Sequence, residues 1–77
     1  MVLSKYYYIN NVPVQIRYLP SGDIAIWHPC NQEIAYIIDG VCRNRGRWNS
    51  HYNNWIVFSQ FKHKVINDIK SRGSNNG

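Results

Sequence analysis

The feature that most constrains the fold is an alternation of period two in residues 12–19. One set of positions is apolar and the other is mixed. The two sets are Val12, Val14, Ile16 and Tyr18, and Pro13, Gln15, Arg17 and Leu19. Such alternation is typical of a strand with one buried and one solvated face. Residues 5–9 also favour a strand, and Asn10-Asn11 suits a two-residue turn with positive φ. The sequence therefore predicts a hairpin.

The rest of the chain predicts an α+β fold. Residues 24–28 read as a third strand, and a period of 3.6 in residues 34–42 predicts a helix after Cys30 or Asn31. Segments around Trp48 and at 55–58 can pair through residues 49–54, and Ser59 is expected to cap a last helix. The expected order is β-β-β-α-β-β-α in a small antiparallel sheet, with two helices on one face. We expect one domain over residues 1–72 and a disordered tail over 73–77.

Charge favours an anionic partner. The 77 residues contain nine Lys and Arg against four Asp and Glu, a formal charge of +5. Such a surplus on a small surface suits nucleic acid, although an anionic membrane would also satisfy it. The chain has no apolar run of membrane-spanning length and no signal-peptide pattern. We therefore expect a cytoplasmic or nucleoid-associated protein that is neither secreted nor bound to a membrane.

The segment 46–58 offers rings for base contact. Trp55 begins an apolar run and is expected in the core. Trp48 follows an arginine-rich turn and precedes Asn49, His51 and Tyr52, whose side chains can hydrogen-bond to base edges or sugars. We expect Trp48 to stack on a base.

A second stacking ring is expected from the strands. Tyr6, Tyr7 and Tyr8 cannot all face inward, so at least one ring is exposed in an open sheet. Trp27 falls on the strand face opposite the neighbouring isoleucines. Tyr7 or Trp27 is therefore expected to stack beside Trp48, although cover by a second copy of the chain explains an exposed tyrosine equally well.

Several basic residues are expected to contact phosphates. Arginine can grip a phosphate with two hydrogen bonds, and lysines at a helix start suggest a bound anion because they oppose the helix dipole. The alternative is that these residues complement a helix end or are solvated. The phosphate-contact candidates are Arg17, Arg43, Arg45, Arg47, Lys62 and Lys64.

No catalytic residue, metal or cofactor is expected. The histidines have no acidic neighbour in sequence, and a histidine-based ribonuclease is left as an alternative. A zinc site would need ligands whose spacing matches no standard pattern. Those ligands would be His28, Cys30, Cys42 and His51.

From about Asp23 to Ile69 the order of features resembles the HARP domain of SNF2-type annealing helicases. The likeness lies in a strand leading into residues 31–38, then Arg47-Trp48-Asn49, then Trp55 seven residues beyond Trp48, then a final helix. The resemblance implies an α+β domain that binds structured or forked DNA. The family's ATP-driven motor is absent from these residues, so the resemblance implies binding or annealing and no ATPase cycle.

We therefore expect a non-catalytic nucleic-acid-binding domain for single-stranded or forked DNA, with DNA favoured over RNA. The alternative is an adaptor or inhibitor whose basic, aromatic surface docks on an acidic protein. A helicase or nuclease is the expected kind of protein partner, and the chain is expected to be a monomer or a weak homodimer.

Overall fold

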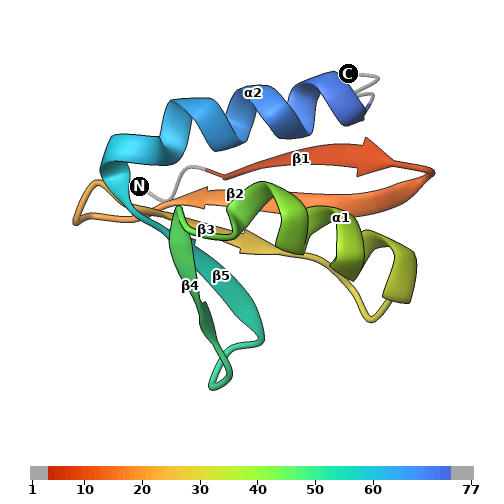
Figure 1. Cartoon of the computed structure of the whole chain (residues 1–77), viewed down its shortest axis with the longest axis horizontal. Helices are drawn as coiled ribbons and strands as arrows, with labels where there is room; N and C mark the ends of the chain where they lie inside the picture. The colour runs from red at the N-terminus through yellow and green to blue at the C-terminus, as the bar shows by residue number, and fades with distance from the viewer. Residues whose placement is uncertain (1–3, 74–77) are drawn as a thin grey trace.

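Two helices lie on one side of a five-stranded antiparallel sheet in the computed structural model, which describes residues 4–73 (Figure 1). The strands are ordered β1-β2-β3-β5-β4, and every pairing is antiparallel. The predicted α+β fold and its element order are confirmed, with one 3₁₀ turn added. The elements are β1 (Ser4–Ile9), β2 (Val12–Tyr18), β3 (Ile24–Trp27), α1 (Gln32–Cys42), β4 (Gly46–Asn49), β5 (Asn54–Val57), the 3₁₀ turn (Ser59–Phe61) and α2 (Lys62–Arg72).

The first hairpin has the turn that the sequence predicts. Asn10 and Asn11 have φ of 52° and 66°, the left-handed conformation that a two-residue turn needs at both central positions. Ile9 then pairs with Val12, and this register places Tyr7 opposite Val14. Because paired residues share a face, the turn determines which tyrosine enters the core.

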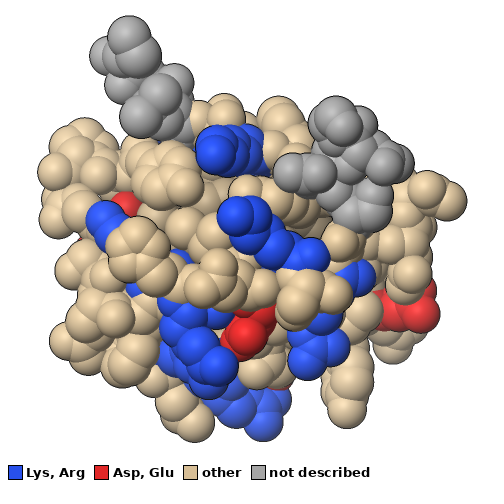
Figure 2. Space-filling model, turned by 90° about the horizontal axis from the view of Figure 1, so that it is seen from above, with Lys and Arg blue, Asp and Glu red and all other residues tan. Residues whose placement is uncertain are grey.

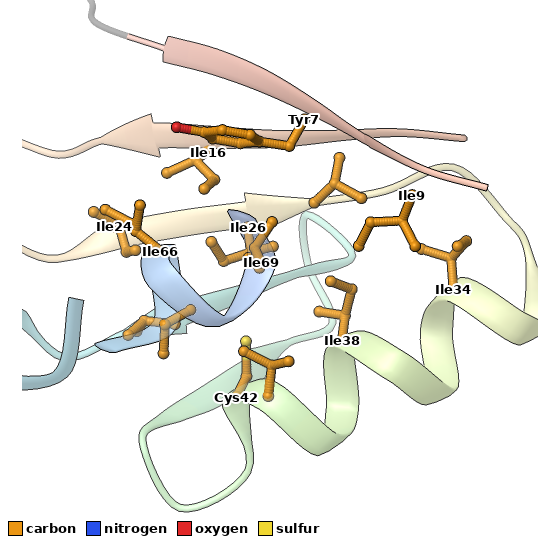
Figure 3. Close-up of a cluster of buried hydrophobic side chains, with 14 residues drawn as sticks. Tyr7, Ile9, Ile16, Ile24, Ile26, Ile34, Ile38, Cys42, Ile66 and Ile69 are labelled. Carbon is orange, nitrogen blue, oxygen red and sulfur yellow. The ribbon is translucent and has the colours of Figure 1, made fainter. Parts of the chain in front are cut away.

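The core fills the space between the sheet and the helices. Val14 and Ile16 of β2 are fully buried, as the alternation predicts. Figure 3 shows isoleucines of β2 and β3 facing side chains of α1 and α2. The cluster comprises Tyr7, Ile9, Val14, Ile16, Ile24, Ile26, Ile34, Ile38, Val41, Cys42, Val57, Val65, Ile66 and Ile69. Most of one face of the sheet is therefore buried against the two helices.

The two helices begin differently. Asn31 caps α1, because its Oδ1 accepts a hydrogen bond of 3.0 Å from the Ile34 N–H. The prediction that Ser59 caps the last helix is wrong. Ser59 instead donates its backbone N–H to Asp23 Oδ1 at 2.9 Å and starts the 3₁₀ turn, so that α2 begins at Lys62 without a side-chain cap. Within residues 4–73, no helix is both long enough and apolar enough to cross a membrane.

Gly73 was predicted to begin the tail but belongs to the packed structure. Its N–H donates to the Ile69 carbonyl at 2.9 Å. A Cβ at this position would lie 2.8 Å from the Tyr8 carbonyl oxygen, so the Gly73 backbone approaches β1 closely. The rest of the predicted disordered tail, residues 74–77, lies outside the described residues.

Because the core lies on one face of the sheet, two neighbouring substitutions in β2 should differ strongly in their effect on stability. Ile16→Ala should lower the free energy of unfolding by about 2 to 5 kcal/mol, because it leaves a cavity between the layers. Arg17→Ala on the uncovered face should change it by less than about 0.5 kcal/mol. Urea denaturation measures both. Equal destabilisation by the two substitutions would contradict a core confined to one face.

Candidate nucleic-acid interface

The sheet face away from the helices carries side chains from all five strands. The pairing places Tyr6, Gln15 and Trp27 in one row across this face. A second row contains Ser4, Arg17, Ala25, Ile56 and Arg47. We call this surface the open sheet face. It comprises Ser4, Tyr6, Tyr8, Pro13, Gln15, Arg17, Ala25, Trp27, Arg47, Asn49, Asn54 and Ile56.

Three aromatic rings are exposed on the open sheet face. Tyr6, Tyr8 and Trp27 are 50%, 42% and 37% exposed. The prediction of an exposed tyrosine in β1 and of Trp27 opposite the isoleucines is confirmed. The prediction that Tyr7 can serve as a stacking ring is wrong, because Tyr7 is 4% exposed and lies in the core beside Ile16 (Figure 3). The signal for Tyr6 and Tyr8 was available in the sequence, since a two-residue turn sets them opposite Gln15 and Pro13.

The open sheet face is basic without being densely charged. Arg17 and Arg47 are its two charged residues, and both are exposed. Within residues 4–73, no strand contains an Asp or Glu. The two guanidinium groups therefore have no carboxylate beside them in the sheet, and each keeps its donors available for an anion.

A hollow of about 460 Å³ lies on the open sheet face beside the β4–β5 loop. Asn54 contributes a side-chain oxygen, Oδ1, that is buried and has no hydrogen-bond partner among the described residues. Asn49 Oδ1 accepts from the His51 N–H at 3.0 Å, so Asn49 shapes the loop. The rings of His51 and Tyr52 meet edge to face, with their centroids 4.5 Å apart. The hollow is lined by Gln15, Arg17, Leu19, Ala25, Trp27, Asn49, Tyr52, Asn54 and Ile56.

Trp48 lies on the opposite side of the sheet from Arg47. It pairs with Trp55, and the two indoles meet edge to face with centroids 5.9 Å apart. Trp55 is half-buried against the core, as predicted, whereas Trp48 is 45% exposed. Arg47 and Trp48 therefore do not share a surface, because consecutive strand residues point to opposite faces.

The other predicted phosphate contacts lie away from the open sheet face. Arg43 forms an ion pair with Asp39 one helical turn earlier in α1. Arg45 donates to the Val41 carbonyl at 2.9 Å and to Asp68 Oδ2 at 3.2 Å, which ties the end of α1 to α2. Arg45 is predicted to contact phosphate, whereas in the structure its guanidinium joins the end of α1 to α2.

Most of the positive charge is on the helix side. Lys64 Nζ lies 3.8 Å from Asp68 Oδ1, one helical turn later in α2, and the two side chains form a surface ion pair. Figure 2, which looks onto the α2 side, shows Lys and Arg gathered there with few acidic groups between them. The basic residues outside the open sheet face are Lys5, Arg43, Arg45, Lys62, Lys64, Lys70 and Arg72. Stacking rings and most cations are therefore on different sides of the molecule.

The cysteines differ in environment. Cys42 is fully buried, and this burial raises the pKa of its thiol to about 12, against the smaller opposing effect of Arg45. Cys30 is exposed. Within residues 4–73, no three His, Cys, Asp or Glu side chains come together as a metal site would require.

Comparison of the chain with models of protein families, with curated proteins and with solved structures finds no match.

The two thiols should react at very different rates. At pH 8 a thiol with pKa near 12 is almost entirely protonated, and the thiolate is the reactive form. A disulfide reagent should titrate one thiol, Cys30, in the folded protein and two in denaturant. Cys30→Ser should abolish the fast reaction. Two fast thiols in the folded protein would contradict the burial of Cys42.

Proposed function

We propose that this domain binds single-stranded nucleic acid on the open sheet face without catalysing a reaction. The observation that supports the proposal is the presence of three exposed rings and two arginines without carboxylate neighbours on one uncovered face. Rings on a sheet that stack bases, beside cations that follow the backbone, are the common features of single-strand binding.

Each group has a distinct part in this proposal. Tyr6, Tyr8 and Trp27 stack on bases, an interaction that tolerates any sequence because every base has a flat π face. Arg17 and Arg47 lie in the same cross-strand row and hold phosphates. Gln15 offers an amide group that can hydrogen-bond to a base or a sugar. Asn49 can offer its amide nitrogen, because its Oδ1 already accepts from the His51 N–H, and Asn54 Oδ1 is buried.

A single strand suits this face better than a duplex. Stacking on a protein ring requires a base whose face is free, and the bases of an intact duplex are stacked on one another. The proposed preference for DNA, and for a forked substrate whose arms include single strands, comes from the HARP resemblance. In this proposal Lys62 and Lys64 attract the polyanion at long range from the helix side and do not touch the bound strand.

A protein-binding adaptor is the second candidate. Tyr36 favours it, because this ring is 83% exposed on α1, away from the open sheet face. Exposed tyrosines commonly anchor protein interfaces. Binding of an acidic protein would require Tyr36, whereas the proposed strand binding would not.

Fluorescence anisotropy with labelled single-stranded, duplex and forked DNA and with RNA, over a salt series, tests the proposed function. We expect the single-stranded and forked DNA to bind most tightly, with affinity falling log-linearly as salt rises. Arg17→Ala and Arg47→Ala should each lower the salt slope by about 0.7, the value for one lost phosphate contact on a single strand. Tyr8→Ala should cost about 1 to 3 kcal/mol of binding free energy.

Arg43→Ala is the matched control, because Arg43 is paired with Asp39 on the helix side. It should leave the salt slope within about 0.3 of the wild-type value, well below the loss of one contact. The proposal fails if the wild-type protein binds none of the four nucleic acids at low salt.

A further inference from the structure

A groove of about 490 Å³ lies on the helix side, between the start of α1 and the β4–β5 hairpin. The hairpin extends beyond the cover of the two helices (Figure 1), which leaves Trp48 accessible there. This volume lies within the range of small-molecule sites, about 300 to 1,000 Å³. The lining residues are Trp27, His28, Pro29, Cys30, Asn31, Gln32, Ala35, Trp48 and Asn53.

The lining suits a flat and uncharged ligand. It contains two indoles and, among the described residues, no Lys, Arg, Asp or Glu. A phosphate would find no counter-charge here, whereas a nucleobase can contact an indole and hydrogen-bond along its edge. Gln32 and Asn53 carry amide groups suited to that edge.

His28 adds an acceptor to the lining of the groove. Its Nδ1 lies 2.9 Å from the Pro29 carbonyl oxygen, which cannot donate, so Nδ1 carries the proton and donates it. In the neutral form of the ring, Nε2 is then the nitrogen that can accept a hydrogen bond. An exocyclic amino group, which adenine, cytosine and guanine carry and thymine lacks, can donate to this nitrogen.

The groove is continuous with the proposed interface. Trp27 lines both the groove and the hollow on the open sheet face. In the β4–β5 loop, Tyr52 contributes to that hollow and the next residue, Asn53, to the groove. The two binding regions therefore meet at the end of β3 and the tip of the hairpin.

We propose that the groove receives one nucleobase of a strand bound on the open sheet face, where the strand passes Trp27, and that the base contacts Trp48. This inference rests on the proposed function and adds to it a single position where the protein reads base identity. Stacking on the open sheet face is tolerant of sequence, whereas the groove favours a base with an amino group.

Trp48→Leu tests this inference, because leucine keeps apolar cover over Trp55 and removes the indole. Anisotropy with a single strand of about twelve nucleotides should show a loss of affinity of about 5- to 150-fold, the range for one stacked base. The salt slope should stay at the wild-type value, since no phosphate contact is lost. The loss of affinity caused by Trp48→Leu should be larger for oligo(dC) than for oligo(dT). It should be absent for an abasic strand of equal length.

Tyr36→Leu is the matched control, because Tyr36 is an exposed ring on α1 that lines neither region. It should bind as the wild type does, and urea denaturation of both variants separates lost binding from lost folding.

If Trp48→Leu fails to fold, Gln32→Ala in the groove lining takes its place and should reduce the oligo(dC) preference. Wild-type affinity for all strands in the folded groove variant, with Arg17→Ala still weakening binding, overturns this inference and leaves the proposed function standing. Absence of binding by the wild-type protein overturns both.

Discussion

The packing of α1 and α2 against a single face of the sheet is the constraint on which the rest of the structure depends. A five-stranded sheet of short strands has two faces, and at this chain length the two helices bury one of them with isoleucine and valine. The other face must remain stable in water. It does so with polar, aromatic and arginine side chains, among them Tyr6, Trp27 and Arg17.

The same alternation divides the candidate site. Arg47 and Trp48 are adjacent in sequence, yet they belong to different surfaces because they are neighbours in a strand. The open sheet face carries two arginines and three rings, and the helix side carries the remaining cations and the groove at Trp48. Trp27 lies where these surfaces meet. The proposed path of a strand therefore follows the end of β3, away from the lysines of α2.

Local patterns predicted much of the fold. The Asn10-Asn11 turn and the alternation in β2 fixed the first hairpin, and the helical period found the buried face of α1 with its Asn31 cap. Ser59 is not a cap, because a 3₁₀ turn over residues 59–61 separates it from α2, and its N–H donates to Asp23, 36 residues away in sequence. Such long-range contacts leave no trace in a local pattern.

The candidate site was less predictable for the same reason. Arg45 pairs with Asp68, 23 residues away, so its structural use could not be read from the arginine-rich segment. By contrast, the burial of Tyr7 in the core and the exposure of Tyr6 and Tyr8 follow from the hairpin register alone. The exposure of residues placed by a turn and its adjoining strands could be predicted from the sequence. The contacts of residues placed by packing between α1, α2 and the second hairpin could not.

Proton–proton NOEs between the protein and a bound strand show directly whether bases stack on the open sheet face. In a complex with short single-stranded DNA, we expect NOEs from base protons to the ring protons of Tyr6, Tyr8 and Trp27. Ring protons of Tyr36 on α1 serve as the reference and should show none. NOEs from the bases to α2 or Tyr36, with none to the rings of the open sheet face, would contradict the account.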